Sequence, residues 1–147
     1  MAITGFIRIE LYENQNNLDT VALLELLQTH GWNFNYYKEI SYLPLGDQEN
    51  FNWTFAPLDQ QDRIMDIIKH KNLNQELIGI TLMWQTTDIG VTALFYPSLK
   101  SISLCLSTNR KTLDQMNVTD FSWYLERFVP PLLEAGLCIE SLECSDG

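Results

Sequence analysis

The sequence predicts an α+β fold in which helices cover one face of a mostly antiparallel sheet. Between residues 77 and 107, apolar residues alternate with polar ones in three consecutive runs, and turn residues separate the runs. Apolar helical patterns flank this region on both sides, which gives the expected order β-α-β-α-β-β-β-α-β. Because the apolar side of the three runs must be covered, we expect the flanking helices to pack on it.

The three runs form the expected centre of the sheet. Each run places its apolar residues two apart, which is the spacing of side chains on one face of a strand. Residues 87–90 and 97–101 supply the turns between them. The side chains expected on the apolar face are Ile78, Ile80, Leu82, Trp84, Val91, Ala93, Phe95, Ile102, Leu104 and Leu106.

The N-terminal part predicts a strand followed by a helix. Residues 5–12 alternate cleanly between apolar and polar, as in a half-buried strand. Residues 19–29 are nearly all aliphatic, and either Asp19 or Asn17 can cap this helix by accepting a bond from a free backbone amide. Gly31 ends the helix, because glycine readily adopts the left-handed conformation after a last turn.

The middle and the C-terminal parts predict shorter strands and two more helices. Residues 32–45 form one or two strands, the alternation of rings in residues 51–55 allows another, and Pro57 begins a helix that runs to about Lys71. Thr119 can cap the start of a third helix, and a kink or two short helices are expected because two prolines, Pro130 and Pro131, interrupt it. Residues 137–144 form a last strand with a bulge or a frayed edge.

Composition limits the class of protein. The 147 residues fit one domain, 1–147, and 46% of them are hydrophobic, which indicates a globular fold. Nineteen acidic residues against nine Lys and Arg give a net charge of −10. Such a charge opposes binding to nucleic acids and to anionic membranes, and it favours cationic partners as well as solubility. The N-terminal residues lack the pattern of a signal peptide, and the three cysteines show no paired spacing, so we expect a cytoplasmic protein.

No motif for catalysis or for a metal is present in the sequence. His30 and His70 end separate predicted helices, and neither has a second His or Cys at ligand spacing. The chain has no nucleophile motif and no glycine-rich phosphate loop. We therefore expect no catalytic residue, no metal and no cofactor, and we favour a non-enzymatic role.

One stretch combines acids with aromatic rings. Residues 46–66 contain five acids against Arg63 alone, and three rings lie between the acids. Rings supply contact area in an interface, while carboxylates steer and pair with Lys or Arg of a partner. The alternative is that the rings pack into the core while the acids face water. The candidate partner-binding residues are Asp47, Glu49, Phe51, Trp53, Asp59 and Asp62.

These observations predict a non-enzymatic acidic binding protein that engages a basic protein partner. In size, acidity and element order the chain is similar to small bacterial immunity proteins, which block a toxin. That likeness carries no motif and assigns no residue. Two alternatives remain: a small-ligand-binding protein or enzyme with a pocket between the helices and the sheet, and an oligomeric structural domain. The sequence does not define the oligomeric state.

Overall fold

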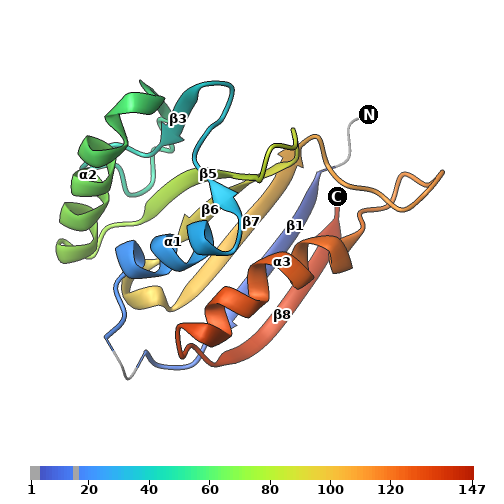
Figure 1. Ribbon diagram of the computed structural model, residues 1–147. Coiled ribbons are helices and arrows are strands. Elements are labelled where there is room, and N and C mark those ends of the chain that lie inside the picture. Colours follow the sequence, from blue (N-terminus) through green and yellow to red (C-terminus); the bar gives the residue numbers. More distant parts are fainter. Residues whose placement is uncertain (1–3, 15–16) are drawn as a thin grey trace.

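The computed structural model describes residues 4–14 and 17–147 (Figure 1). Three helices and two short 3-10 helices connect the strands of one sheet. The helices are α1 (Thr20–Thr29), η1 (Leu58–Gln60), α2 (Gln61–Leu73), η2 (Pro97–Leu99) and α3 (Phe121–Glu134). The strands are β1 (Gly5–Leu11), β2 (Trp32–Asn33), β3 (Glu39–Tyr42), β4 (Thr54–Pro57), β5 (Ile78–Trp84), β6 (Gly90–Phe95), β7 (Ser101–Thr108) and β8 (Ile139–Asp146).

All eight described strands belong to one antiparallel sheet. Its order is β4-β3-β5-β6-β7-β1-β8, and the two-residue strand β2 pairs with β5 beside β3. The meander expected between residues 77 and 107 is confirmed as β5, β6 and β7, with Ile80 opposite Ala93 and Ala93 opposite Leu104. The N-terminal strand β1 lies between β7 and the C-terminal strand β8.

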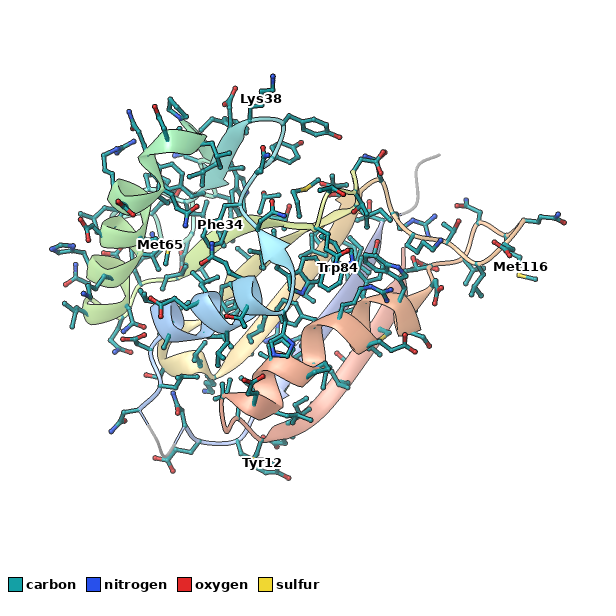
Figure 2. The ribbon with its side chains drawn as sticks, in the orientation of Figure 1. Tyr12, Phe34, Lys38, Met65, Trp84 and Met116 are labelled. Atoms are coloured by element: carbon teal, nitrogen blue, oxygen red, sulfur yellow. The ribbon has the colours of Figure 1, made fainter. Side chains whose placement is uncertain are left out.

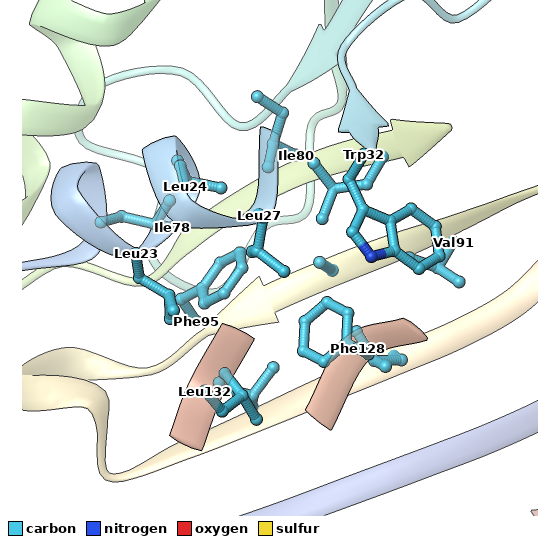
Figure 3. Packing of buried hydrophobic residues seen from close by; sticks show 14 of the residues in the cluster. Leu23, Leu24, Leu27, Trp32, Ile78, Ile80, Val91, Phe95, Phe128 and Leu132 are labelled. Atoms are coloured by element: carbon cyan, nitrogen blue, oxygen red, sulfur yellow. The ribbon is translucent and has the colours of Figure 1, made fainter. Parts of the chain in front are cut away.

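The helices pack on one face of this sheet, which confirms the α+β class. In Figure 1, α1 and α3 lie in front of the strands, and α2 packs beside α1. Figure 3 shows the resulting core, in which leucines of α1 and α3 meet the apolar side of the meander. The labelled core residues are Leu23, Leu24, Leu27, Trp32, Ile78, Ile80, Val91, Phe95, Phe128 and Leu132.

The opposite face of the sheet, here called the open face, carries a second set of side chains. Gly79 lies between the core residues of β5 and therefore faces this side. A methyl group added at Gly79 would lie 2.7 Å from Leu43 Cδ1 and 2.8 Å from Trp53 Cη2. Leu43 is buried but does not belong to the main core. Only glycine leaves room for these two side chains, so the loop after β3 packs closely on the sheet here.

Helix α3 is a single helix that runs through both prolines, so of the two expected alternatives, a kink or two short helices, the second is wrong. Pro131 has no amide hydrogen, which leaves the carbonyl of Arg127, four residues earlier, without its helical donor. The indole Nε1 of Trp32 donates to this carbonyl at 3.0 Å. A partner outside the helix thus supplies the hydrogen bond that Pro131 cannot make.

The helix caps follow the expectation at α1 and depart from it at α3. The Asp19 carboxylate accepts from the amide of Ala22 at 2.7 Å, which confirms one of the two expected caps. At α3 the cap is Asp120 rather than Thr119. The Thr119 hydroxyl is engaged elsewhere, because its oxygen accepts from Arg110 Nη1 at 2.6 Å and its proton is donated to the Asp146 carboxylate.

The last strand forms one edge of the sheet. In its pairing with β1, Glu10 lies opposite Ser141 and Leu11 lies opposite Ile139, so one residue of β8 is extra and the expected bulge is confirmed. Strand β4 forms the other edge. Within residues 4–14 and 17–147, none of the helices has the length and apolar character that crossing a membrane requires.

Candidate functional site

The acidic-aromatic stretch falls on the connection after β3, on β4 and on the start of α2. Asp47 is only 5% exposed, and its carboxylate accepts from the amides of Asn50 at 3.0 Å, Phe51 at 3.1 Å and Asn52 at 2.7 Å. Its oxygens are therefore occupied by its own loop. We assign Asp47 to holding Phe51 in place rather than to touching a partner.

Lys71 of α2 holds the same loop through hydrogen bonds to its backbone. Its buried ammonium donates to the carbonyls of Pro44 at 2.7 Å and Asp47 at 2.9 Å, and to Glu76 Oε1 at 3.3 Å. Burial lowers the pKa of Lys71, while the hydrogen bond and the charge of Glu76 act in the opposite direction. Glu76 also accepts from the amide of Gly46 at 2.7 Å. The loop is thus held by a buried ion pair.

The aromatic rings of the stretch are not packed into the core. Phe51 is 47% exposed and Phe55 is 54% exposed, whereas Trp53 is half-buried against Gly79. Phe55 lies opposite Ser41 in the β3–β4 pairing, and this register places it on the open face with Trp53. Phe51 has a φ of +52°, which is uncommon for a residue with a side chain. The alternative in which these rings fill the core therefore fails for Phe51 and Phe55.

Phe55 forms one wall of a hollow that the sequence did not predict. The hollow has a volume of about 220 Å³ and is lined by Tyr36, Tyr37, Glu39 and Phe55; we call it the open hollow. The rings of Tyr36 and Phe55 are nearly parallel, at 23°, with centres 6.5 Å apart. The rings of Tyr36 and Tyr37 meet edge to face at 4.8 Å. Tyr37 is 62% exposed, so the hollow opens to solvent.

A tight turn carries two of these rings. Tyr36 and Glu39 exchange backbone hydrogen bonds of 2.9 and 3.0 Å around Tyr37 and Lys38, whose φ angles are +50° and +71°. Both central residues have positive φ, as in a type I′ turn, where Asn and Gly are preferred. Such conformations cost on the order of 1–3 kcal/mol each at residues with a side chain. Backbone strain of this kind is common at functional sites.

Side chains from neighbouring segments support the strained turn. Asn35 Oδ1 accepts from the amide of Lys38 at 2.8 Å, and Asn109 Nδ2 donates to the hydroxyl of Tyr37 at 3.2 Å. Asn109 also donates to the carbonyl of Asp88 at 2.8 Å, which ties the turn to the loop after β5. Figure 2 shows Lys38 at the outer end of the molecule, above β3. The rings are therefore held in position before any partner binds.

The remaining predicted acids do not converge on the rings. Glu49 is exposed on the loop after β3, Asp59 is exposed in η1, and Asp62 is exposed in the first turn of α2. Helix α2 contributes to the core between helices and sheet, whereas Trp53 and Phe55 face the other side. Asp59 and Asp62 thus contribute negative charge around the sheet edge rather than contacts inside the hollow.

Sequence reasoning missed Tyr36, Tyr37 and Glu39. They lie in a segment that reads as a strand, and the turn between Tyr36 and Glu39 lacks the Asn-Gly pair that marks a two-residue hairpin. The adjacent pair of tyrosines was the available signal. Their meeting with Phe55 depends on the β3–β4 pairing, which the local pattern does not specify.

A second aromatic cluster lies between α3 and the sheet. The Arg127 guanidinium carbon is 4.2 Å from the ring centre of Trp123 and 5.4 Å from that of Trp84. Trp84 meets the buried ring of Trp32 edge to face at 5.1 Å, and Trp32 meets Phe128 at 6.0 Å. We call these five residues the closed cluster; Figure 2 marks its Trp84 beside α3. A shallow hollow of about 330 Å³ beside it is lined by His30, Trp84, Glu126 and Arg127.

Another hollow lies apart from both groups of rings. It has a volume of about 680 Å³ and lies among the end of β1, the start of α1 and η2. Its charged lining residues are Glu13, Asp19 and Lys100, and the lining contains no histidine or cysteine. Within residues 4–14 and 17–147, no three His, Cys, Asp or Glu side chains gather as metal ligands. Comparison of the chain with protein-family models, with curated proteins and with solved structures gives no match.

Proposed function

We propose that this chain is a non-enzymatic binding protein that engages a basic protein partner through the exposed rings of Tyr37, Phe51 and Phe55. The observation that carries the proposal is that these rings are exposed, Phe55 on strand β4 and Tyr37 and Phe51 on hydrogen-bonded loops at residues with positive φ. Exposed apolar side chains that a fold holds rigidly, at a conformational cost, mark interaction sites. Aromatic residues are also enriched among those that dominate binding energy.

Charge supports the choice of a basic partner. Between residues 36 and 66 the chain has six acids and two bases, Lys38 and Arg63. Five of the six acids are exposed: Glu39, Glu49, Asp59, Asp62 and Asp66. Surface carboxylates around an apolar centre accelerate encounter with a positive surface and disfavour acidic competitors. A nuclease-like toxin is one such partner, because its surface is basic. The similarity of the chain to immunity proteins in size, acidity and element order favours this choice. The three free cysteines accord with a reducing, cytoplasmic setting.

The proposal is tested by affinity capture with matched variants, followed by a measured binary affinity. The wild-type chain, the variant Phe51→Ser/Phe55→Ser and the control Phe6→Ser are immobilised. Phe6 is a suitable control because its ring is 45% exposed but lies on β1, away from the predicted surface. Any basic protein retained by the wild type is purified, and its Kd for each variant is measured by calorimetry.

We expect the double variant to bind at least about 30-fold more weakly, which corresponds to the usual threshold of 2 kcal/mol for an anchor residue. The Phe6→Ser control should bind as the wild type does. Raising the salt concentration should slow association while leaving dissociation nearly unchanged. Equal binding by all three chains, or retention of acidic proteins only, would contradict the proposal.

A further inference from the structure

We propose that the open hollow receives the cationic end of a lysine or arginine side chain. This inference rests on the proposed function and adds the chemical group that the surface recognises. Three aromatic residues, Tyr36, Tyr37 and Phe55, line the hollow together with one acidic residue, Glu39. Aromatic faces carry negative potential and attract a cation within about 6 Å of the ring centre. A carboxylate beside the rings adds a hydrogen-bond acceptor for the same cation.

The combination of rings and carboxylate selects against other ligands. An anion would be repelled by Glu39 and by the ring faces. A purely apolar side chain would cover the Glu39 carboxylate without giving it a hydrogen bond, which is unfavourable. A guanidinium or ammonium group satisfies both parts of the lining at once. Glu39 is exposed, and among the described residues it takes part in no ion pair, so its charge is not already neutralised.

The same protein uses this chemistry internally at the closed cluster. There the ring faces of Trp84 and Trp123 are taken up by the guanidinium of Arg127. On the open face, the guanidinium of Arg8 lies 5.7 Å from the ring centre of Tyr96. Among the described residues, no lysine or arginine lies in this way over Tyr36, Tyr37 or Phe55. The cation for the open hollow therefore comes from another molecule.

The hollow is also preorganised, which matters for a small contact. The Asn109 side chain fixes the Tyr37 hydroxyl, and the strained turn fixes the position of Tyr36 relative to Glu39. Phe55 is held on β4 by its pairing with Ser41. A site whose groups are already in place loses less conformational entropy on binding. Rings on flexible segments would not bind one side chain selectively.

The test is an NMR titration of the whole ¹⁵N-labelled chain with three small probes. Nα-acetyl-argininamide and Nα-acetyl-lysinamide carry the cation, and Nα-acetyl-citrullinamide has nearly the shape of the first without its charge. We expect saturable shifts at the amides of residues 36–39 and of Phe55 with the two cations. The citrulline probe should bind at least about tenfold more weakly, because it loses the attraction of three rings and of Glu39.

Two variants and two controls locate the binding. Phe55→Leu and Glu39→Gln should each weaken argininamide binding at least about threefold, the loss expected for one exposed cation–π or ionic contact. Phe6→Leu and Glu25→Gln, which remove an exposed ring on β1 and an exposed acid on α1, both outside the hollow, should leave the Kd unchanged within about twofold. The spectrum of each variant shows whether it is folded before the probes are added.

Three outcomes would overturn the inference: equal binding of the citrulline probe, shifts spread over Glu49, Asp59 and Asp62, or no saturable shift at 36–39. These results differ from failure of the proposed function. If the probes do not bind in the hollow, but the Phe51→Ser/Phe55→Ser variant no longer binds a basic partner that the wild type retains, the binding function stands. Only the role of the hollow is then wrong. If the cations bind but no basic partner is retained, the cation site stands and the protein-binding function falls.

Discussion

The closed cluster and the open hollow are built from similar side chains but differ in what occupies their ring faces. In the closed cluster, Arg127 of the chain itself lies over Trp84 and Trp123, and Trp32 and Phe128 continue the contact into the core. In the open hollow, the rings of Tyr37 and Phe55 face solvent beside Glu39. The first arrangement fastens α3 to the sheet. In the second, no lysine or arginine of the described residues lies over the rings.

This difference separates stability from binding. A ring whose neighbours all belong to the same chain contributes its buried area to folding. A ring that stays half-exposed contributes little to folding and keeps that area for a partner. Mutations in the closed cluster should therefore change the free energy of unfolding, whereas mutations in the open hollow should change the affinity for a partner.

The largest effect is expected from truncating one ring in each region. Phe128→Ala removes a fully buried side chain and should lower the free energy of unfolding by about 3–5 kcal/mol, as is typical for such cavities. Phe55→Ala removes an exposed ring and should change it by no more than about 0.5 kcal/mol. Urea denaturation measures both. If Phe55→Ala destabilises the chain as much as Phe128→Ala, the open hollow is part of the core.

The bond between Trp32 and the Arg127 carbonyl gives the next prediction. Trp32→Phe should cost about 1–3 kcal/mol, because a buried acceptor loses its donor. In the background of Pro131→Ala the same change should cost about 1 kcal/mol less, because the new amide at residue 131 supplies the donor. A double-mutant cycle measures the difference. Equal costs in both backgrounds would show that the proline and the indole are not coupled.

The strained turn predicts a gain in stability. Lys38→Gly should raise the free energy of unfolding by about 1 kcal/mol, because glycine adopts the left-handed conformation without strain. Lys100→Gly is a matched control, since Lys100 is also exposed but has an ordinary φ of −68°. It should bring no gain. A loss of stability in Lys38→Gly would show that the turn is not strained.

The smallest expected effect is on the free energy of unfolding at acidic pH. Hydrogen bonds from the hydroxyl and the amide of Thr119, aided by the charge of Arg110, lower the pKa of Asp146 below its ordinary value of 3.8. A carboxyl with a lowered pKa in the folded chain stabilises the fold above the unfolded pKa, and this contribution is lost as the pH falls below about 4. The stability difference between wild type and Asp146→Asn should therefore be constant at neutral pH and shrink in acid.

Urea denaturation from pH 7 to pH 3 measures that difference. Thr119→Val removes the hydroxyl donor and should reproduce part of the Asp146→Asn profile. Glu39→Gln, which alters the open hollow, is the control. In its background, Asp146→Asn should change the free energy of unfolding at each pH as much as it does in the wild type. A difference that grows in acid would contradict the direction of the pKa change.

The elements that follow a local pattern could be predicted from the sequence. The meander β5–β7 and the cap at Asp19 depend on side-chain period and on neighbouring amides, and both are confirmed. The continuity of α3 could not be predicted, because the donor for Arg127 comes from Trp32, 95 residues away in sequence. Tertiary contacts here outweigh the local effect of two prolines.

The candidate site was predicted only in part for the same reason. Phe51 was a candidate binding residue and is exposed, whereas Phe55, which is also exposed, was not among the candidates, and the candidate Trp53 is half-buried. Asp47 was placed with them because it is acidic and nearby, but its carboxylate binds amides of its own loop, a geometry that composition does not reveal. Tyr36 and Glu39 join Phe55 only through the pairing of β3 with β4.

The two edges of the sheet oppose pairing between copies of the chain in different ways. At β4, Pro57 lacks an amide hydrogen, and the strand has only four residues, so another strand finds few donors there. At β8 the protection is electrostatic: a second copy brings the same Glu140, Glu143 and Asp146 to the contact, and the two edges repel each other. Salt screens this repulsion, because the Debye length falls from about 10 Å at 0.1 M to about 3 Å at 1 M. Resistance to edge-to-edge polymerisation is therefore permanent at β4 and conditional on ionic strength at β8.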